Sequence, residues 1–464
     1  MSPMGLPVRL FLLTTAAISI AQTPHSETLP RAPGAALVEI SPRGGTYSEP
    51  SVAFDLIHPE RLLVVYQVGG FAAYSTDAGK SFQLSNNSRP TGYRMTGDVS
   101  TAFDNLGHAF LCYLAFDHLG TSEYWAHAAG RNGIYVRRSL DGGKSWDKDS
   151  IAVKAYPTGH EPDLNFEDQP RIFADTGPRS RYRGNLYVGW IEWQMNQSLI
   201  LFSRSIDDGR SWSPALRIST HAGLPRDDNG SVGGFVQAVA PDGAIYAAWH
   251  DGNQITFTES HDGGQTFSPS RPIIETAPPY FSDVTGVYRV DGFPQIAIDP
   301  QDRRLYVTWS DYRNGDIDVF LASSSDRGRH WSPPIRVNDD PLHDGTDQFF
   351  QWLAVDEATG DVYVQFYDRR ADSGNIKIGF TLARSTDGGR SFKNYAWSEN
   401  SFEAKGAFLG DYTWLAAYNH RVYGVWTEAL PNVMAQVAPG AEPSEAPRIS
   451  TLIRFGSADF STTR

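Results

Sequence analysis

One short phrase occurs six times in this chain of 464 residues and constrains its fold more than any other feature. The copies read STDAGKSF (75–82), SLDGGKSW (139–146), SIDDGRSW (205–212), SHDGGQTF (260–267), SSDRGRHW (324–331) and STDGGRSF (385–392). The aspartates of successive copies lie 64, 66, 55, 64 and 61 residues apart. A period of this kind indicates that one supersecondary unit is repeated and that its copies stack on one another.

Each copy of the phrase predicts the corner of a β-hairpin. The aspartate side chain accepts hydrogen bonds from backbone amides further along, and the glycine two positions later takes the positive φ that the turn requires. The closing Trp or Phe is a large apolar side chain suited to burial beneath the turn. Ligand binding by these aspartates is the alternative, but six copies of one turn are typical of architecture.

A second repeat precedes each phrase and sets the number of units. It consists of a strand that mostly ends in Asp, a turn, and a strand that ends in an aromatic residue. The seven copies are 50–55 with 62–66, 99–104 with 108–113, 170–175 with 186–190, 236–240 with 245–249, 294–299 with 305–309, 352–356 with 362–366, and 413–418 with 422–426. We therefore expect an all-β fold, a β-propeller of seven four-stranded blades, with six blades as the alternative.

The seventh unit has no phrase after it and must take its outer strands from elsewhere. Residues 448–454 are expected to form its third strand, and residues 36–40 its fourth. The pairing of the N-terminal strand with the last blade would close the ring and remove its free edges. Residues 36–464 then form a single propeller domain.

The N-terminus has the pattern of a secretory signal. Arg9 supplies a positive charge and residues 10–21 an apolar segment with small residues near its end, so residues 1–21 are predicted to be a signal peptide and 22–35 a linker. We expect a secreted or periplasmic protein. Its single cysteine, Cys112, cannot form an intrachain disulfide and lies in an apolar run typical of a core strand.

Charge and motifs exclude several classes of function. A net charge of −13 argues against nucleic acid and anionic membrane surfaces as partners, and a monomer is expected. The sequence contains no zinc-protease motif, no nucleophile elbow and no phosphate loop. No cofactor is required by this interpretation. The acid-rich stretch 338–344 can supply oxygen ligands to Ca²⁺, with a solvated loop as the alternative.

Strand alternation assigns the polar residues to the two ends of the propeller. The repeated corners join third to fourth strands, so they occupy one face; the connections from fourth to first and from second to third strands occupy the other. Candidate substrate-contacting residues on that second face are Glu49, Asp98, Asp168, Arg171, His250, Asp291, Asp311, Arg313, Asp368, Arg370 and Asp411. Convergent carboxylates repel one another in a dry site, so we expect raised pKa values or a bound cation.

The repeated phrase resembles the Asp-box, or BNR repeat, of sialidase-like β-propellers, and the resemblance covers about residues 45–430. Tyr412, Thr413 and Leu415 are also similar to the Tyr-Ser-x-Leu context of the sialidase nucleophile. The resemblance implies an exo-α-sialidase-like glycoside hydrolase with a carboxylate-rich axial cleft and Tyr412 as nucleophile. By the same resemblance Asp411 or Glu49 is the base that activates it. Asp98 or Asp168 would then be the general acid, and Arg171, Arg313 and Arg370 would bind an anionic sugar.

The chain departs from that family at the start of the first blade. Sialidases carry the first arginine of their triad in an Arg-Ile-Pro phrase, whereas the corresponding residues here are Ser48, Glu49 and Pro50. Seven blades instead of six is a second departure. The substrate can therefore be an acidic or a neutral glycan. Two alternatives stay open: a non-catalytic propeller that binds glycan or protein, and a polysaccharide lyase that uses His118 or His250.

Overall fold

The computed structural model describes residues 29–67, 69–88, 92–158, 164–228, 230–279, 283–436 and 449–462. Within these ranges the ordered elements are β-strands, arranged as seven antiparallel sheets. The expected signal peptide (1–21) and the first part of the linker lie outside the described residues. A search of the described residues for a helix long and apolar enough to cross a membrane finds no candidate.

Blades 1 to 4 each consist of four consecutive strands. Blade 1 contains β2 (Ser48–Phe54), β3 (Leu62–Gln67), β4 (Phe71–Ser75) and β5 (Gln83–Leu84). Blade 2 contains β6 (Met95–Phe103), β7 (Ala109–Phe116), β8 (Asn132–Ser139) and β9 (Ile151–Tyr156). Blade 3 contains β10 (Phe166–Ala174), β11 (Leu186–Trp193), β12 (Ser198–Ser205) and β13 (Leu216–Arg217). Blade 4 contains β14 (Val232–Val239), β15 (Ile245–Asp251), β16 (Gln254–Ser260) and β17 (Arg271–Glu275).

Blades 5 to 7 complete the ring, and the last of them combines both ends of the chain. Blade 5 contains β18 (Gln295–Ile298), β19 (Leu305–Asp311), β20 (Asp318–Ser324) and β21 (Ile335–Arg336). Blade 6 contains β22 (Gln348–Val355), β23 (Val362–Asp368), β24 (Lys377–Ser385) and β25 (Lys393–Ala396), and β26 (Phe402–Glu403) also pairs with β24. Blade 7 contains β27 (Trp414–Tyr418), β28 (Arg421–Met434), β29 (Ile449–Asp459) and β1 (Ala36–Glu39).

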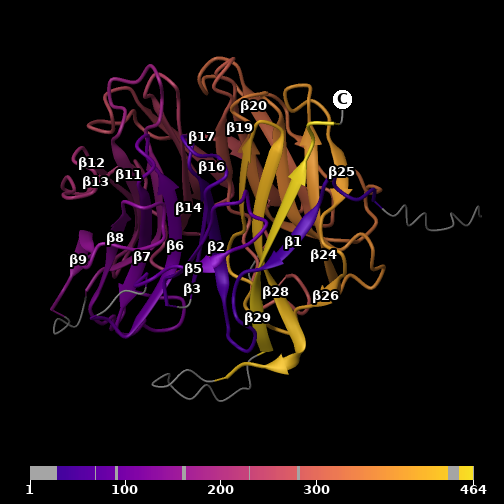
Figure 1. Ribbon diagram of the computed structural model, residues 1–464, viewed down its shortest axis with the longest axis horizontal. Coiled ribbons are helices and arrows are strands. Elements are labelled where there is room, and N and C mark those ends of the chain that lie inside the picture. The colour runs from indigo at the N-terminus through magenta and orange to yellow at the C-terminus, as the bar shows by residue number, and fades with distance from the viewer. Residues whose placement is uncertain are drawn as a thin grey trace, which may run out of the picture.

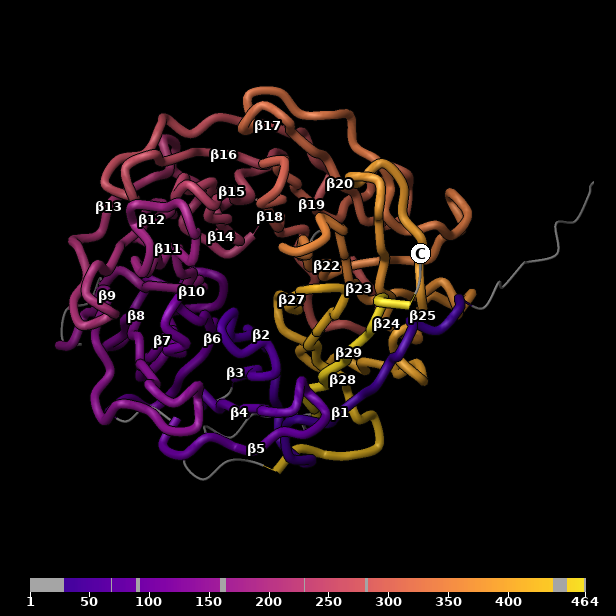
Figure 2. Tube along the Cα trace, turned by 45° about the horizontal axis from the view of Figure 1, so that its top comes forward, coloured from indigo at the N-terminus to yellow at the C-terminus, as the bar shows by residue number. Residues whose placement is uncertain are grey.

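The expected seven blades and their closure are confirmed. Figure 2 shows the first strands β2, β6, β10, β14, β18, β22 and β27 surrounding the centre of the ring. The indigo strand β1 lies beside the yellow strand β29 in Figures 1 and 2, and Ala36 pairs with Ser457 in this antiparallel ladder. The two ends of the chain are thereby held in one sheet, which closes the ring.

The hydrophobic core lies between consecutive blades. One cluster joins Phe110 and Cys112 of blade 2 to Val188 and Trp190 of blade 3, all fully buried. Burial raises the pKa of the Cys112 thiol, and this side chain packs as a small apolar residue of the core. Interblade packing of this kind explains why a chain of this length forms one domain without a disulfide in the described residues.

The repeated turns fasten each blade to the preceding one. Ser81 donates from its backbone amide to Asp77 Oδ1 over 3.0 Å and from its hydroxyl to Oδ2 over 2.6 Å, and the other turns repeat this pattern. Gly143 has φ of 91°, and a Cβ there would lie 2.7 Å from Leu63 of the preceding blade. The six aspartates therefore hold turns, and glycine is needed for both conformation and close packing.

Candidate active site

A cavity of about 660 Å³ lies where the innermost strands β2, β6 and β10 begin. Its walls come from these strand starts, from the ends of β3 and β7, and from the connections 218–231, 276–294 and 397–413 between blades. These segments belong to the face opposite the repeated turns. The first and third strands of each blade begin at this face, and the repeated turns follow the third strands at the other face. The volume falls in the range of small-molecule and cofactor pockets, roughly 300–1,000 Å³.

A β-bulge at the start of each of several innermost strands aims side chains into this region. The pairing register shifts between Ser48 and Ser51, and equivalent shifts occur in blades 2, 3, 4 and 6. Glu49, Asp98 and Gln169 occupy the bulges with positive φ of 51°, 46° and 50°. A non-glycine residue in this conformation is uncommon, and such positions cluster at functional sites. Bulges also re-aim side chains beside active sites.

Three of the expected carboxyl groups form a continuous chain along one wall. Glu49, Asp98 and Asp168 line the cavity, and Asp98 is hydrogen-bonded to both of the others. Burial, together with the neighbouring negative charge, raises the pKa of Glu49 to about 8. Burial and the charge of Glu49 raise the pKa of Asp98 well above its usual range. This wall therefore holds protonated carboxyl groups near neutral pH.

A backbone amide and an indole N–H fix the two ends of this carboxyl chain. The amide of Asp411 donates to Glu49 Oε1 over 3.2 Å, and a Cβ at Gly410 would lie 2.6 Å from Cγ of Glu49. Only glycine at position 410 allows this approach. At the other end Trp193 Nε1 donates to Asp168 Oδ2 over 2.9 Å. Burial and the charge of Asp98 raise the pKa of Asp168 well above its ordinary value.

A second group of acids is organised around Arg289. Its Nε donates to Asp411 Oδ1 over 2.6 Å, and its Nη1 lies 3.2 Å from Asp227 Oδ2. Burial raises the pKa of Asp227 to about 7, although the Arg289 charge opposes the shift. Asp291 is buried beside Asp411, and burial with that negative charge raises its pKa well above normal. Arg289 thus pairs with two carboxyl groups of the site.

Apolar and aromatic side chains also line the cavity. They include Leu114, Phe116, Leu119, Trp125, Phe166, Tyr288 and Phe408. Trp125 also donates a hydrogen bond to Asp227, and this contact lowers the pKa of that carboxyl against the effect of burial. A pocket lined largely by apolar and aromatic side chains with a few polar groups among them is the usual form of a ligand site.

Tyr412 and Arg171 lie beneath the cavity and are absent from its lining. The hydroxyl of Tyr412, a buried side chain, donates to the carbonyl of Val99 over 3.3 Å, and the Arg171 guanidinium lies 3.7 Å from its ring centroid. Burial and the charge of Glu49 raise the pKa of Tyr412 well above normal. The position indicates that both residues support the carboxyl wall from below.

The other predicted substrate-binding residues lie apart from the cavity. Arg313 pairs with Asp311, its Nε 2.8 Å from Oδ1, and Arg370 pairs with Asp368, its Nε 2.6 Å from Oδ2. Each of these ion pairs holds the end of its own hairpin. His250 and Asp291 line a small void beside the cavity, which Asp227 and Phe293 also line.

Several residues of the cavity could not be identified from the sequence pattern. Asp227, Arg289, Trp125, Tyr288 and Phe408 all come from connections between strands, outside the repeated units. The one available signal was length, because the connections 276–294 and 397–413 are much longer than a turn requires. Long connections with little secondary structure of their own are commonly functional.

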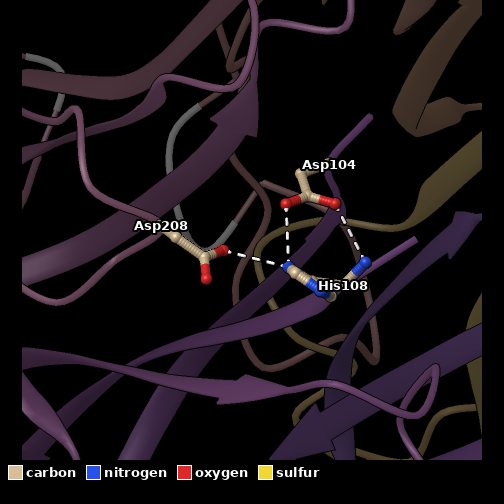
Figure 3. A group of neighbouring side chains, drawn as sticks. All are labelled: Asp104, His108 and Asp208. Atoms are coloured by element: carbon tan, nitrogen blue, oxygen red, sulfur yellow. Dashed lines mark hydrogen bonds and ion pairs between the residues drawn. The ribbon is translucent and has the colours of Figure 1, made fainter. Parts of the chain in front are cut away.

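A separate group of side chains has the composition of a metal site. Asp104, His108 and Asp208 place one potential ligand atom each within 4.8 Å of one another, in the part of the chain that the structure describes (Figure 3). His108 Nδ1 lies 3.1 Å from Asp208 Oδ1 and 3.3 Å from Asp104 Oδ2, and Arg138 Nη1 lies 2.5 Å from Asp208 Oδ2. Because Arg138 already supplies positive charge, we interpret the group as a contact between blades 2 and 3.

The acid-rich stretch 338–344 also contacts arginine. Arg370 lies 2.5 Å from Asp339 Oδ1 and 3.4 Å from Asp340 Oδ1, and Arg336 Nη1 lies 4.0 Å from Asp340 Oδ2. Burial raises the pKa of Asp340 to about 6. Calcium binding by this stretch stays a prediction, to be tested by metal analysis of the purified protein.

Comparison with known proteins shows similarity of structure alone. No protein-family model matches the sequence, and no curated protein matches it. A protein of unknown function from Dyadobacter fermentans DSM 18053 is 16% identical with a TM-score of 0.45, over 91% of this chain and 99% of that one. The Hadza microbial sialidase Hz136 is 15% identical with a TM-score of 0.47, over 87% of this chain and 74% of that one. A Penicillium chrysogenum α-L-arabinanase is 13% identical with a TM-score of 0.44, over 90% of this chain and 98% of that one. The propeller fold of this chain is established by its own seven sheets and their arrangement in a closed ring.

Proposed function

We propose that the protein is a glycoside hydrolase that cleaves a neutral glycan in the cavity at the start of β2, β6 and β10. The observation that carries the proposal is the wall of Glu49, Asp98 and Asp168, which line the cavity as hydrogen-bonded carboxyl groups with raised pKa values. Glycoside hydrolysis needs a carboxyl group that is still protonated near the working pH and a second carboxyl group that is ionised.

The two groups of acids suit these two roles. In our assignment Asp98, supported by Asp168, is the general acid and gives its proton to the glycosidic oxygen as the bond to the anomeric carbon breaks. The carboxyl group of Asp411, which accepts a hydrogen bond from Arg289, stabilises the positive charge that develops on the sugar ring. A water molecule then forms the new bond to the anomeric carbon and loses its proton to a carboxylate of the site.

The charge of the cavity favours an uncharged substrate. Its lining contains the carboxyl groups of Glu49, Asp98, Asp168, Asp227 and Asp411 but only Arg289 and Lys405 as cations. Arg289 is already paired with Asp411 and Asp227. A sugar carboxylate would therefore find no uncommitted guanidinium in this lining, and burying it without a cationic partner is costly. This argument sets sialic acid aside in favour of neutral sugars.

The Tyr412 nucleophile of the family resemblance is less well supported than a carboxyl mechanism. Tyr412 is buried, stands outside the cavity lining and has a strongly raised pKa, whereas a tyrosine nucleophile must reach the anomeric carbon and lose its proton easily. In our proposal Tyr412 positions the wall formed by Glu49 and Asp98.

The test is a screen of the purified protein on neutral and acidic aryl glycosides and on intact polysaccharides. We expect turnover of at least one neutral substrate and its loss in Asp98→Asn, with the fold unchanged by circular dichroism. Cleavage of sialosides alone would overturn the neutral assignment. Binding of polysaccharide without new reducing ends would favour the glycan-binding alternative, and an unsaturated product would favour a lyase. Export, expected from residues 1–21, is tested by sequencing the N-terminus of the mature protein.

A further inference from the structure

The mouth of the cavity carries an exposed aromatic side chain on a well-anchored loop. Tyr288 is 65% exposed and, among the large hydrophobic side chains exposed in the described residues, it is the single aromatic one. It lines the cavity together with Leu119 and Met95, which are also exposed. Exposed single hydrophobic residues need no explanation, but several beside one pocket indicate a contact surface.

The loop that carries Tyr288 is held by its neighbours on both sides. Val284, Val287 and Val290 are buried in the hydrophobic core, so Tyr288 points outward from a segment whose other apolar residues point inward. Thr285 accepts a hydrogen bond of 2.8 Å from Arg369 Nη2 through its carbonyl. The exposure of Tyr288 is therefore a property of a fixed loop.

A second aromatic ring and the carboxyl site both contact this loop. The Tyr288 and Phe408 rings pack edge to face with centroids 5.9 Å apart, and the amide of Gly406 donates to the carbonyl of Gly286 over 2.7 Å. Arg289 lies 5.1 Å from the Phe408 ring centroid and pairs with Asp411. The aromatic pair is thus set at a fixed place relative to the acids of the site.

From this arrangement we propose that Tyr288, held in place by its edge-to-face contact with Phe408, forms a stacking platform for the sugar unit next to the one that is cleaved. The inference rests on the proposed hydrolase function and adds that the substrate is a chain of neutral sugars. A pyranose or furanose ring presents C–H groups on one face and hydroxyl groups at its edge. The face of an aromatic ring can pack against the C–H groups, and the phenol of Tyr288 can form hydrogen bonds with the sugar hydroxyl groups. The platform selects for chain length, because a single sugar bound at the acids does not reach it.

The test measures binding separately from cleavage. Binding of neutral gluco-, xylo-, arabino-, galacto- and manno-oligosaccharides, from monosaccharide to hexasaccharide, is measured by calorimetry in an Asp98→Asn background. Variants carrying Tyr288→Ala and Tyr288→Trp are compared in that background. Leu342→Ala serves as the matched control, since Leu342 is an exposed hydrophobic residue of another connection that does not line the cavity.

We expect Tyr288→Ala to weaken binding of the longer oligosaccharides by about five- to tenfold, the size of an aromatic contact, and to leave the monosaccharide within about twofold. Tyr288→Trp and Leu342→Ala should both bind like the parent. An equal loss at every length, or no loss at any length, overturns the platform. If aryl glycosides are hydrolysed but Tyr288→Ala shows no length effect, the platform fails and the hydrolase stands. If Tyr288-dependent binding occurs without cleavage by the wild type, the hydrolase fails and the platform stands.

Discussion

Arg289 and Asp411 form a largely buried ion pair although 122 residues separate them in the chain, with Nε of Arg289 2.6 Å from Oδ1 of Asp411. The pair joins the connection between blades 4 and 5 to the connection between blades 6 and 7. Nη1 of Arg289 also lies 3.2 Å from Asp227, which follows blade 3. One guanidinium therefore compensates carboxylates from two other connections, and without it these acids would face one another unpaired.

Removal of this cation should destabilise the fold. Arg289→Met leaves Asp411 and Asp227 buried without their partner, and breaking a buried ion pair costs about 3–5 kcal/mol. Denaturant unfolding measures the change. The control is Arg421→Met, because Arg421 lies 3.8 Å from Asp459 in an exposed pair, and such pairs contribute about 0–1 kcal/mol. Equal losses in the two variants would contradict the role assigned to Arg289.

The carboxyl wall predicts a specific pattern of lost activity. Asp98→Asn should lower kcat by about 10²–10⁴-fold, since the amide cannot give a proton to the leaving group. Wild-type kcat/KM should fall as pH rises through the raised pKa of the acid, because the protonated form is the active one. Asp311→Asn, which alters a buried carboxyl outside the cavity, is the control. Retention of full activity in Asp98→Asn would remove the general acid from the mechanism.

Stability should depend on pH through Glu49. Its pKa rises from the ordinary 4.5 to about 8 in the folded protein. Between these values the folded state keeps a proton that the unfolded state has lost, so the free energy of unfolding falls as pH rises. One such proton contributes up to about 1.4 kcal/mol per pH unit. Unfolding midpoints from pH 5 to pH 8 should fall less steeply in Glu49→Gln, and an unchanged slope would contradict a protonated Glu49.

The variant Tyr412→Phe distinguishes two possible roles of Tyr412, that of a catalytic nucleophile and that of a residue that supports the site. The phenol hydroxyl donates to the buried carbonyl of Val99, so its removal should reduce stability by roughly 1–3 kcal/mol. Turnover at a temperature well below the unfolding midpoint should stay within about tenfold of wild type. A loss larger than about a thousandfold, with the melting temperature little changed, would instead restore Tyr412 as the nucleophile.

The repeated turns should contribute to stability and leave catalysis unchanged. Hydrogen bonds from Ser81, with others in the turn, lower the pKa of Asp77 to about 2 from 3.8. A carboxylate with a lowered pKa stabilises the fold above the unfolded value and loses that contribution as pH falls through the folded one. Asp77→Ala should therefore unfold at a lower denaturant concentration at pH 6, and this difference should shrink towards pH 2. The kinetic constants of Asp77→Ala on the neutral substrate should be the same as those of the wild type.

Much of the architecture could be read from local chemistry. Each turn contains an aspartate, a glycine and an aromatic residue, such as Asp77, Gly79 and Phe82. These residues make their contacts with residues close by in the chain and with the neighbouring strand. The sequence shows seven pairs of strands and two outer strands, at residues 36–40 and 448–454. These were enough to predict a closed ring, because an unpaired strand edge is unfavourable in any arrangement of the loops. Strand alternation also placed Glu49, Asp98 and Asp168 on one face, since alternation depends only on the order of strands.

The contacts of the site itself were decided by tertiary structure. Arg289, Asp227 and Trp125 meet because closure of the ring brings connections from different blades to one mouth, and no local pattern encodes which loops converge. The same closure buries Tyr412 beneath the carboxyl wall and leaves Arg313 and Arg370 paired with acids two residues away, outside the cavity. Turns and strand order follow from short-range geometry and hydrogen bonding, whereas protonation and charge pairing depend on burial among residues far apart in the chain.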